Sequence, residues 1–129
     1  MAAIIATSCC GSKDNSQTPI QGSVKTVDYD EFEKIISDKS VRIIDVRTAK
    51  EFAESHIAKA ENHDVNASDF ADNFTPGKCG KNKNVLAVYC RSGRRSLKAA
   101  DILSKKGFTV YNLGGGIMAW QRAGKAVTK

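Results

Sequence analysis

Residues 90 to 96, Cys-Arg-Ser-Gly-Arg-Arg-Ser, combine a nucleophile with a cluster of cations. They follow the apolar run from Val85 to Tyr89 and lead into a segment with helix-like spacing, so the sequence predicts a strand, a tight loop and a helix. In such a loop, backbone N–H groups and the first turn of the helix surround the residue that opens the loop. Three nearby guanidinium groups add to this positive field. Together these features favour the thiolate of Cys90, the form that attacks electrophilic sulfur.

A buried cysteine at the end of a strand is the structural alternative, because cysteine is among the residues most often buried. That alternative explains neither the clustered arginines nor Gly93, which frees the backbone to curl. We therefore interpret Cys90 as the nucleophile. The active-site loop that would bind its substrate consists of Arg91, Ser92, Gly93, Arg94, Arg95 and Ser96.

The elements that position this loop alternate between strands and helices. We expect strands at residues 41–46, 85–89 and 108–113, helices at 48–55, 66–74 and 95–106, a first helix after Asp28 and a last one holding Ile117 and Trp120. Asp28 and Thr48, each followed by a glutamate three residues later, are the expected N-caps of the first two helices. Short apolar strands separated by helices predict an α/β fold, with a central, mainly parallel sheet covered by helices on both faces.

Length and charge narrow the functional classes. A chain of 129 residues fits one domain that buries its own core, and no apolar run is long enough to span a bilayer. From Lys78 onward, twelve Lys or Arg accompany the single acidic residue Asp101, so the basic surplus lies in the half that holds Cys90. Because no basic stripe interleaved with aromatic residues accompanies this charge, we expect a small anionic substrate and no nucleic acid.

The other cysteines do not form a metal-binding pattern. Cys9 and Cys10 are adjacent, and neither histidine lies at ligand spacing from a cysteine. We therefore expect no metal and no cofactor. Cys79 lies in a loop rich in glycine and lysine, where it is either an exposed thiol or a resolving cysteine that forms a disulfide with oxidised or persulfidated Cys90.

The first 23 residues differ in composition from residues 24–129, which we expect to form the folded domain. Residues 12–22 are rich in small and polar side chains, as in a flexible tether. The preceding residues 2–9 are apolar and small and end at Cys9, which resembles the end of a bacterial lipoprotein signal. Two interpretations stay open: a cell-envelope or periplasmic protein anchored to the membrane through a lipid on Cys9, or a cytoplasmic protein with a disordered N-terminus.

Several further motifs occur in a fixed order around the cysteine loop. They are Asp-Val-Arg at 45–47, Glu-Phe at 51–52, His-Ile at 56–57, Ala60, and Gly-Gly-Gly at 114–116 followed by Trp120. Over about residues 24 to 125, this order resembles the single-domain rhodanese-like sulfurtransferases. One segment departs from the family: residues 55–60 read Ser-His-Ile-Ala-Lys-Ala, where the family usually has Gly-His-Ile-Pro-Gly-Ala.

The resemblance implies a three-layer sandwich and a persulfide on Cys90 as the intermediate. Sulfur would come from thiosulfate or a similar anionic donor, and a thiol, cyanide or a protein would accept it. Backbone N–H groups of residues 91–95 would stabilise the sulfur anion, and Arg91, Arg94 and Arg95 would orient the donor. Asp45 and Arg47 are expected to form a structural ion pair near the site. We expect a monomer.

Two alternatives remain beside this enzyme. A rhodanese-like domain can act as a persulfide carrier or binding module for one partner protein. Phosphatases and arsenate reductases of the same fold place five residues between cysteine and arginine, whereas four separate Cys90 from Arg95, and Ser96 takes the arginine position. The shorter loop makes a smaller cradle, which suits a sulfur atom better than a phosphoryl group.

Overall fold

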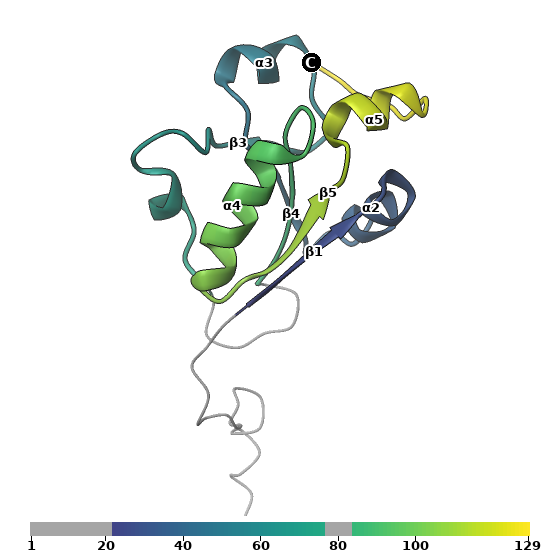
Figure 1. Cartoon of the computed structure of the whole chain (residues 1–129). Helices are drawn as coiled ribbons and strands as arrows, with labels where there is room; N and C mark the ends of the chain where they lie inside the picture. Colours follow the sequence, from purple (N-terminus) through teal and green to yellow (C-terminus); the bar gives the residue numbers. More distant parts are fainter. Residues whose placement is uncertain (1–21, 77–83) are drawn as a thin grey trace, which may run out of the picture.

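The computed structural model describes residues 22–76 and 84–129. Five strands form one sheet in the order β1-β5-β4-β2-β3, and every neighbouring pair is parallel (Figure 1). The strands are β1 (Ser23–Val27), β2 (Arg42–Asp45), β3 (Glu61–Asn62), β4 (Val85–Tyr89) and β5 (Thr109–Leu113). The helices are α2 (Tyr29–Ile36), α3 (Ala49–Glu54), the short 3-10 helix η2 (Phe70–Asn73), α4 (Arg94–Lys105) and α5 (Gly116–Arg122).

Two buried clusters, one on each face of the sheet, hold the layers together. One cluster packs Ala99, Ala100 and Leu103 of α4 against the sheet. The other holds Phe32 of α2 with Trp120 of α5, whose rings meet edge to face at 6.1 Å. Figure 1 shows α4 on one side of the strands and α2 and α5 on the other. The prediction of an α/β sandwich with a parallel sheet is confirmed.

The central strand β4 serves both clusters, because successive side chains of a strand point to opposite faces. Leu86, Val88 and Cys90 belong to the cluster under α4, whereas Ala87 and Tyr89 belong to the other. Cys90 follows the last residue of β4, at the edge where all the parallel strands end. This register directs its side chain toward the start of α4.

The structure adds two strands that the sequence pattern did not predict. In β1 only Val27 is buried, so the strand has no apolar alternation to detect, and β3 contains only two residues, both polar. The predicted helix over residues 66–74 is wrong in extent: one 3-10 turn forms there instead, over residues 70–73. The short turn suffices because Phe70 and Phe74 both reach the core and pack at 5.3 Å.

The predicted helix starts are confirmed. Asp28 accepts a hydrogen bond from the Glu31 backbone at 2.9 Å, and Thr48 and Glu51 form a reciprocal capping box at the start of α3. No helix among the described residues is long and apolar enough to cross a membrane. Residues 1–21 of the predicted tether, which include Cys9, and the segment 77–83 with Cys79 lie outside the described residues, whereas Ser23, also assigned to the tether, begins β1.

Tyr89 provides a test of how the sheet holds the segment after α3. Its fully buried hydroxyl accepts a hydrogen bond from the Ile57 backbone at 3.0 Å, and Ile57 is itself buried. Tyr89→Phe leaves that N–H without its acceptor, so we expect urea-induced unfolding to show a loss of about 1–3 kcal/mol. Tyr111→Phe is the matched control, since nothing in the described part of the chain bonds the Tyr111 hydroxyl. Equal losses in the two variants would contradict the assignment.

Candidate active site

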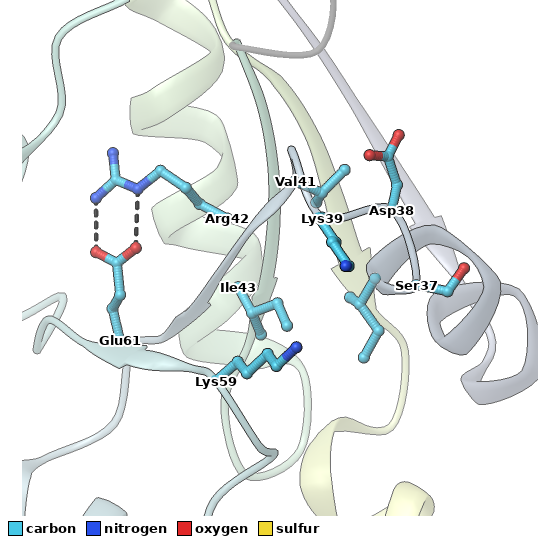
Figure 2. Close-up of a pocket in the computed structure, with 9 residues that line it drawn as sticks. Ser37, Asp38, Lys39, Val41, Arg42, Ile43, Lys59 and Glu61 are labelled. Carbon is cyan, nitrogen blue, oxygen red and sulfur yellow. Dashed lines mark hydrogen bonds and ion pairs between the residues drawn. The ribbon is translucent and has the colours of Figure 1, made fainter.

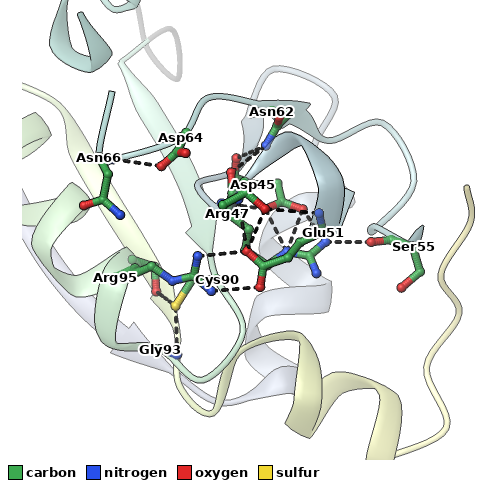
Figure 3. Close-up of polar contacts among 12 residues, drawn as sticks. Asp45, Arg47, Glu51, Ser55, Asn62, Asp64, Asn66, Cys90, Gly93 and Arg95 are labelled. Atoms are coloured by element: carbon green, nitrogen blue, oxygen red, sulfur yellow. Dashed lines mark hydrogen bonds and ion pairs between the residues drawn. The ribbon is translucent and has the colours of Figure 1, made fainter. Parts of the chain in front are cut away.

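Cys90 opens a loop that folds back over its own sulfur. The Gly93 N–H donates to Cys90 Sγ at 3.0 Å, and the Ser96 hydroxyl lies 3.4 Å from the same atom (Figure 3). Gly93 has a φ of +103°, a conformation that residues with a side chain rarely adopt. Cys90 is fully buried, so its sulfur lies at the bottom of the loop.

The environment of the sulfur favours its ionised form. Burial by itself raises the pKa of a thiol, but hydrogen bonds from the Ser96 hydroxyl and from the backbone of Ser96, Gly93 and Ser92 outweigh that effect. The net result is a lowered pKa for Cys90. Of the N–H groups expected to form a cradle, those of Ser92 and Gly93 donate to the sulfur, and the backbone and hydroxyl of Ser96 add to them.

The back of the loop rests on the start of α5. Ile117 donates its N–H to the Cys90 carbonyl at 2.9 Å, and Met118 donates to the Arg91 carbonyl at 3.1 Å. Between the two segments stands Gly116, with a φ of +64°, where an added Cβ would lie 2.2 Å from the Arg91 carbonyl oxygen. The glycine-rich turn at 114–116 thus allows α5 to approach the cysteine loop closely.

Arg95 is engaged by a carboxylate from α3. Its guanidinium makes two parallel hydrogen bonds to Glu51, at 2.9 and 3.0 Å, and both side chains are partly buried. The hydrogen bond from Arg95 is the main reason that the pKa of Glu51 falls to about 2. Arg95 is expected from the sequence to orient the sulfur donor, whereas in the structure its charge is already compensated by Glu51.

Arg91 and Arg94 differ from Arg95. Both side chains are exposed, as is Ser92, and neither arginine forms an ion pair within the described residues. Their charges therefore remain available to an anion that approaches the loop.

Asp45 and Arg47 form a buried pair at the end of β2. Arg47 Nη2 lies 2.6 Å from Asp45 Oδ2 and also donates to the Ser55 carbonyl at 2.6 Å. The Arg47 guanidinium stacks over the Tyr89 ring at 5.7 Å. These contacts tie the segment after α3 to the sheet, which is the structural role expected for the pair.

Comparison with known proteins identifies the family to which this chain belongs. Residues 28–123 match the model of the rhodanese-like domain. This chain belongs to the rhodanese-like domain family. It is 33% identical to a sulfurtransferase of Allochromatium vinosum, over 78% of this chain and 92% of that protein. It is 34% identical to the thiosulfate sulfurtransferase GlpE of Shewanella oneidensis, over 78% of this chain and 96% of the relative.

A solved structure agrees with this assignment. The rhodanese-related protein of Thermoplasma volcanium superposes with a TM-score of 0.66 at 25% identity, covering 81% of this chain and 97% of that one. The rhodanese-like protein described here still departs from the usual family motif at residues 55–60. There Lys59, at the position where the family has glycine, adopts a φ of +71°.

Lys59 also lines a pocket that is separate from the cysteine loop (Figure 2). This cavity of ≈ 430 Å³ lies where the chain enters β2, between Ile36, Val41 and Ile43 on its apolar side and Lys39 and Lys59 at its rim. Cys90 lies at the opposite, carboxyl edge of the parallel sheet. Within the described residues, no group of His, Cys, Asp and Glu side chains is arranged to hold a metal ion.

The close approach of α5 leads to a prediction for Gly116. In Gly116→Ala the new methyl group collides with the Arg91 carbonyl, so the loop must shift. The N–H groups that donate to Cys90 Sγ then lose their alignment. We expect at least a roughly tenfold loss of sulfurtransferase activity together with a lower melting temperature. Gly124→Ala is the control, because Gly124 has a similar φ of +84° but no atom within 4 Å of the added carbon. If both variants lose activity equally, backbone strain alone is responsible and the contact is unimportant.

Proposed function

We propose that this protein is a sulfurtransferase that carries the transferred sulfur as a persulfide on Cys90. The observation that supports this most directly is the set of backbone N–H donors around Cys90 Sγ, with the Gly93 N–H at 3.0 Å. They favour the thiolate, which is the nucleophilic form. The chain's sulfurtransferase relatives point to the same chemistry.

The reaction divides into two half-reactions. The Cys90 thiolate attacks the outer sulfur of thiosulfate, the sulfur–sulfur bond of the donor breaks, and sulfite leaves with the bonding electrons. The enzyme then holds Cys90 as an anionic persulfide. A thiol, cyanide or a protein nucleophile attacks the outer sulfur of that persulfide, and the Cys90 thiolate is the leaving group. No base is needed beyond the groups that favour the thiolate.

The loop donors serve both half-reactions. In the first they stabilise the attacking thiolate, and in the second they stabilise the same thiolate as it leaves. Fixed N–H dipoles act in this way without reorganising during the reaction, as the donors of an oxyanion hole do in acyl transfer.

Donor recognition falls to Arg91 and Arg94. Both guanidinium groups are exposed beside the loop, whereas Arg95 is bound to Glu51. Two free positive charges at the entrance favour an anionic donor over a neutral one. Thiosulfate is the donor that we propose.

Intact-protein mass spectrometry after incubation with thiosulfate tests the proposal. We expect a gain of one sulfur atom that dithiothreitol or cyanide removes. Cys90→Ser should show no gain and no thiosulfate:cyanide activity, because a serine hydroxyl can neither ionise here nor carry a persulfide. Cys79→Ser is the matched control and should keep both properties if Cys79 is only a loop thiol.

The alternatives give different outcomes in the same experiment. A persulfide carrier for one partner would gain sulfur but release it slowly to cyanide. A binding module would gain none. Cys90-dependent hydrolysis of an aryl phosphate without sulfur uptake would overturn the proposal in favour of a phosphatase.

Charge at the loop entrance should act on donor capture. We expect Arg91→Ala and Arg94→Ala each to raise the KM for thiosulfate roughly fivefold with little change in kcat, because an exposed charged contact contributes about 1 kcal/mol. Added salt should likewise raise the KM of the wild-type protein for thiosulfate, because it screens these charges. Arg122→Ala, on the last turn of α5, is the control and should leave KM unchanged. Indifference of KM to both loop substitutions would show that the donor is not recognised here.

A further inference from the structure

A row of hydrogen-bonded polar side chains runs behind Cys90, from the buried Ser96 and Asn112 to the exposed Thr26. Ser96 Oγ lies 2.5 Å from Asn112 Oδ1 and 3.4 Å from Cys90 Sγ, and Asn112 Nδ2 donates to Thr26 Oγ1 at 3.2 Å. Ser96 is fully buried and Asn112 is 2% exposed. Burying polar side chains to this degree costs free energy unless they are paired. The hydrogen bonds of Ser96 and Asn112 therefore have a fixed pattern.

The sheet register brings these residues together. Asn112 on β5 is the register partner of Thr26 on β1, so the two side chains stand beside each other on the face covered by α4. Ser96 lies in the first turn of α4, directly above that face. In the cysteine loop the hydroxyl of Ser96 then meets the sulfur of Cys90.

Ser96 has one hydroxyl proton and two acceptors for it. The amide oxygen of Asn112 is nearly 1 Å closer than the sulfur of Cys90. Thr26 holds the other end of the amide by accepting from Nδ2, which keeps the oxygen turned toward Ser96. The proton therefore lies mainly on the line to Asn112, and Cys90 receives only a weak bond from Ser96.

We propose that Asn112 is a positioning residue that draws the Ser96 hydroxyl proton away from Cys90 and thereby keeps the cysteine sulfur strongly nucleophilic. This inference rests on the proposed role of Cys90 as the attacking atom. A thiolate that is stabilised too strongly attacks more slowly, and the best attacking thiol ionises close to the working pH. The loop N–H groups push Cys90 toward the thiolate, and Asn112 limits how far that effect goes.

The charged groups that surround Cys90 do not take part in this row of side chains. Figure 3 shows Arg95 with its partner Glu51, Asp64 beyond them, and the buried pair Asp45 and Arg47 at the end of β2. The exposed Arg91 and Arg94 complete the set. Substitutions at Asn112 or Thr26 leave these charges in place. A shift in the titration of Cys90 is then traced to the Ser96 proton.

The test measures the pKa of Cys90 from the ultraviolet absorbance of its thiolate. The absorbance of the same variant carrying Cys90→Ser is subtracted from that of each variant. The difference is the signal of Cys90 alone, because the other cysteines contribute to both. In Asn112→Leu the Ser96 proton has only the sulfur as acceptor, so we expect the pKa of Cys90 to fall by about half a unit to one unit. Ser96→Ala removes the donor, and there we expect the pKa to rise.

Thr26→Val provides a second variant at an exposed site, where folding is not at risk. Without its acceptor the amide turns its N–H toward Ser96, which releases the hydroxyl proton to Cys90 and lowers the pKa in the same direction. Thr26→Ser keeps the acceptor and should match the wild type. If Asn112→Leu does not fold, the comparison of Thr26→Val with Thr26→Ser decides the question.

The double variants with Ser96→Ala separate positioning from a general structural effect. If Asn112 acts through Ser96, Asn112→Leu changes nothing in the Ser96→Ala background. The inference is overturned if Asn112→Leu still lowers the pKa of Cys90 in the Ser96→Ala background. It is also overturned if the pKa is unchanged or raised in both Asn112→Leu and Thr26→Val. Because the titration uses no sulfur donor, its outcome is independent of persulfide formation. Absence of the persulfide with these shifts intact would refute the proposed function alone.

Discussion

A loop that turns its N–H groups inward must turn carbonyl groups outward, and those carbonyls also need partners. In this protein the start of α5 meets that need. The N–H groups of its first turn, which have no acceptor within the helix, donate to the carbonyls of Cys90 and Arg91. This arrangement depends on Gly116, because any side chain there would collide with the Arg91 carbonyl. The N–H donors around the sulfur are therefore ordered by a helix whose own hydrogen bonds go to the loop carbonyls.

The arginines of the loop divide into one that is already paired and two that remain exposed. Arg95 is bound to a carboxylate from another helix, whereas Arg91 and Arg94 extend into solvent. The division follows from position, since Arg95 lies inside the first turn of α4 and faces α3. A cluster that looks uniform in the sequence thus contains one arginine that stabilises the fold of the site and two that are free to meet an anion.

The strand, loop and helix around Cys90 could be predicted because their determinants are local: an apolar run, a glycine and helical spacing. The caps at Asp28 and Thr48 are local for the same reason. The strands β1 and β3 could not be predicted, because β1 has almost no buried side chains and β3 is two polar residues long. The pairing of Arg95 with Glu51 and of Ser96 with Asn112 joins residues 44 and 16 positions apart. No short-range pattern encodes such contacts, and only the sheet order and register bring them about.

Glu51 links two helix starts through one oxygen atom. Its Oε1 accepts from the Thr48 backbone, which begins α3, and from Arg95 in the first turn of α4. The helix α3 is six residues long and has no buried side chain, so it is among the elements that open most readily in the native state. Each fraying event at the start of α3 loosens the carboxylate that compensates Arg95, next to Cys90. Local opening of α3 therefore changes the electrostatic field at the sulfur, because it releases the carboxylate that compensates Arg95.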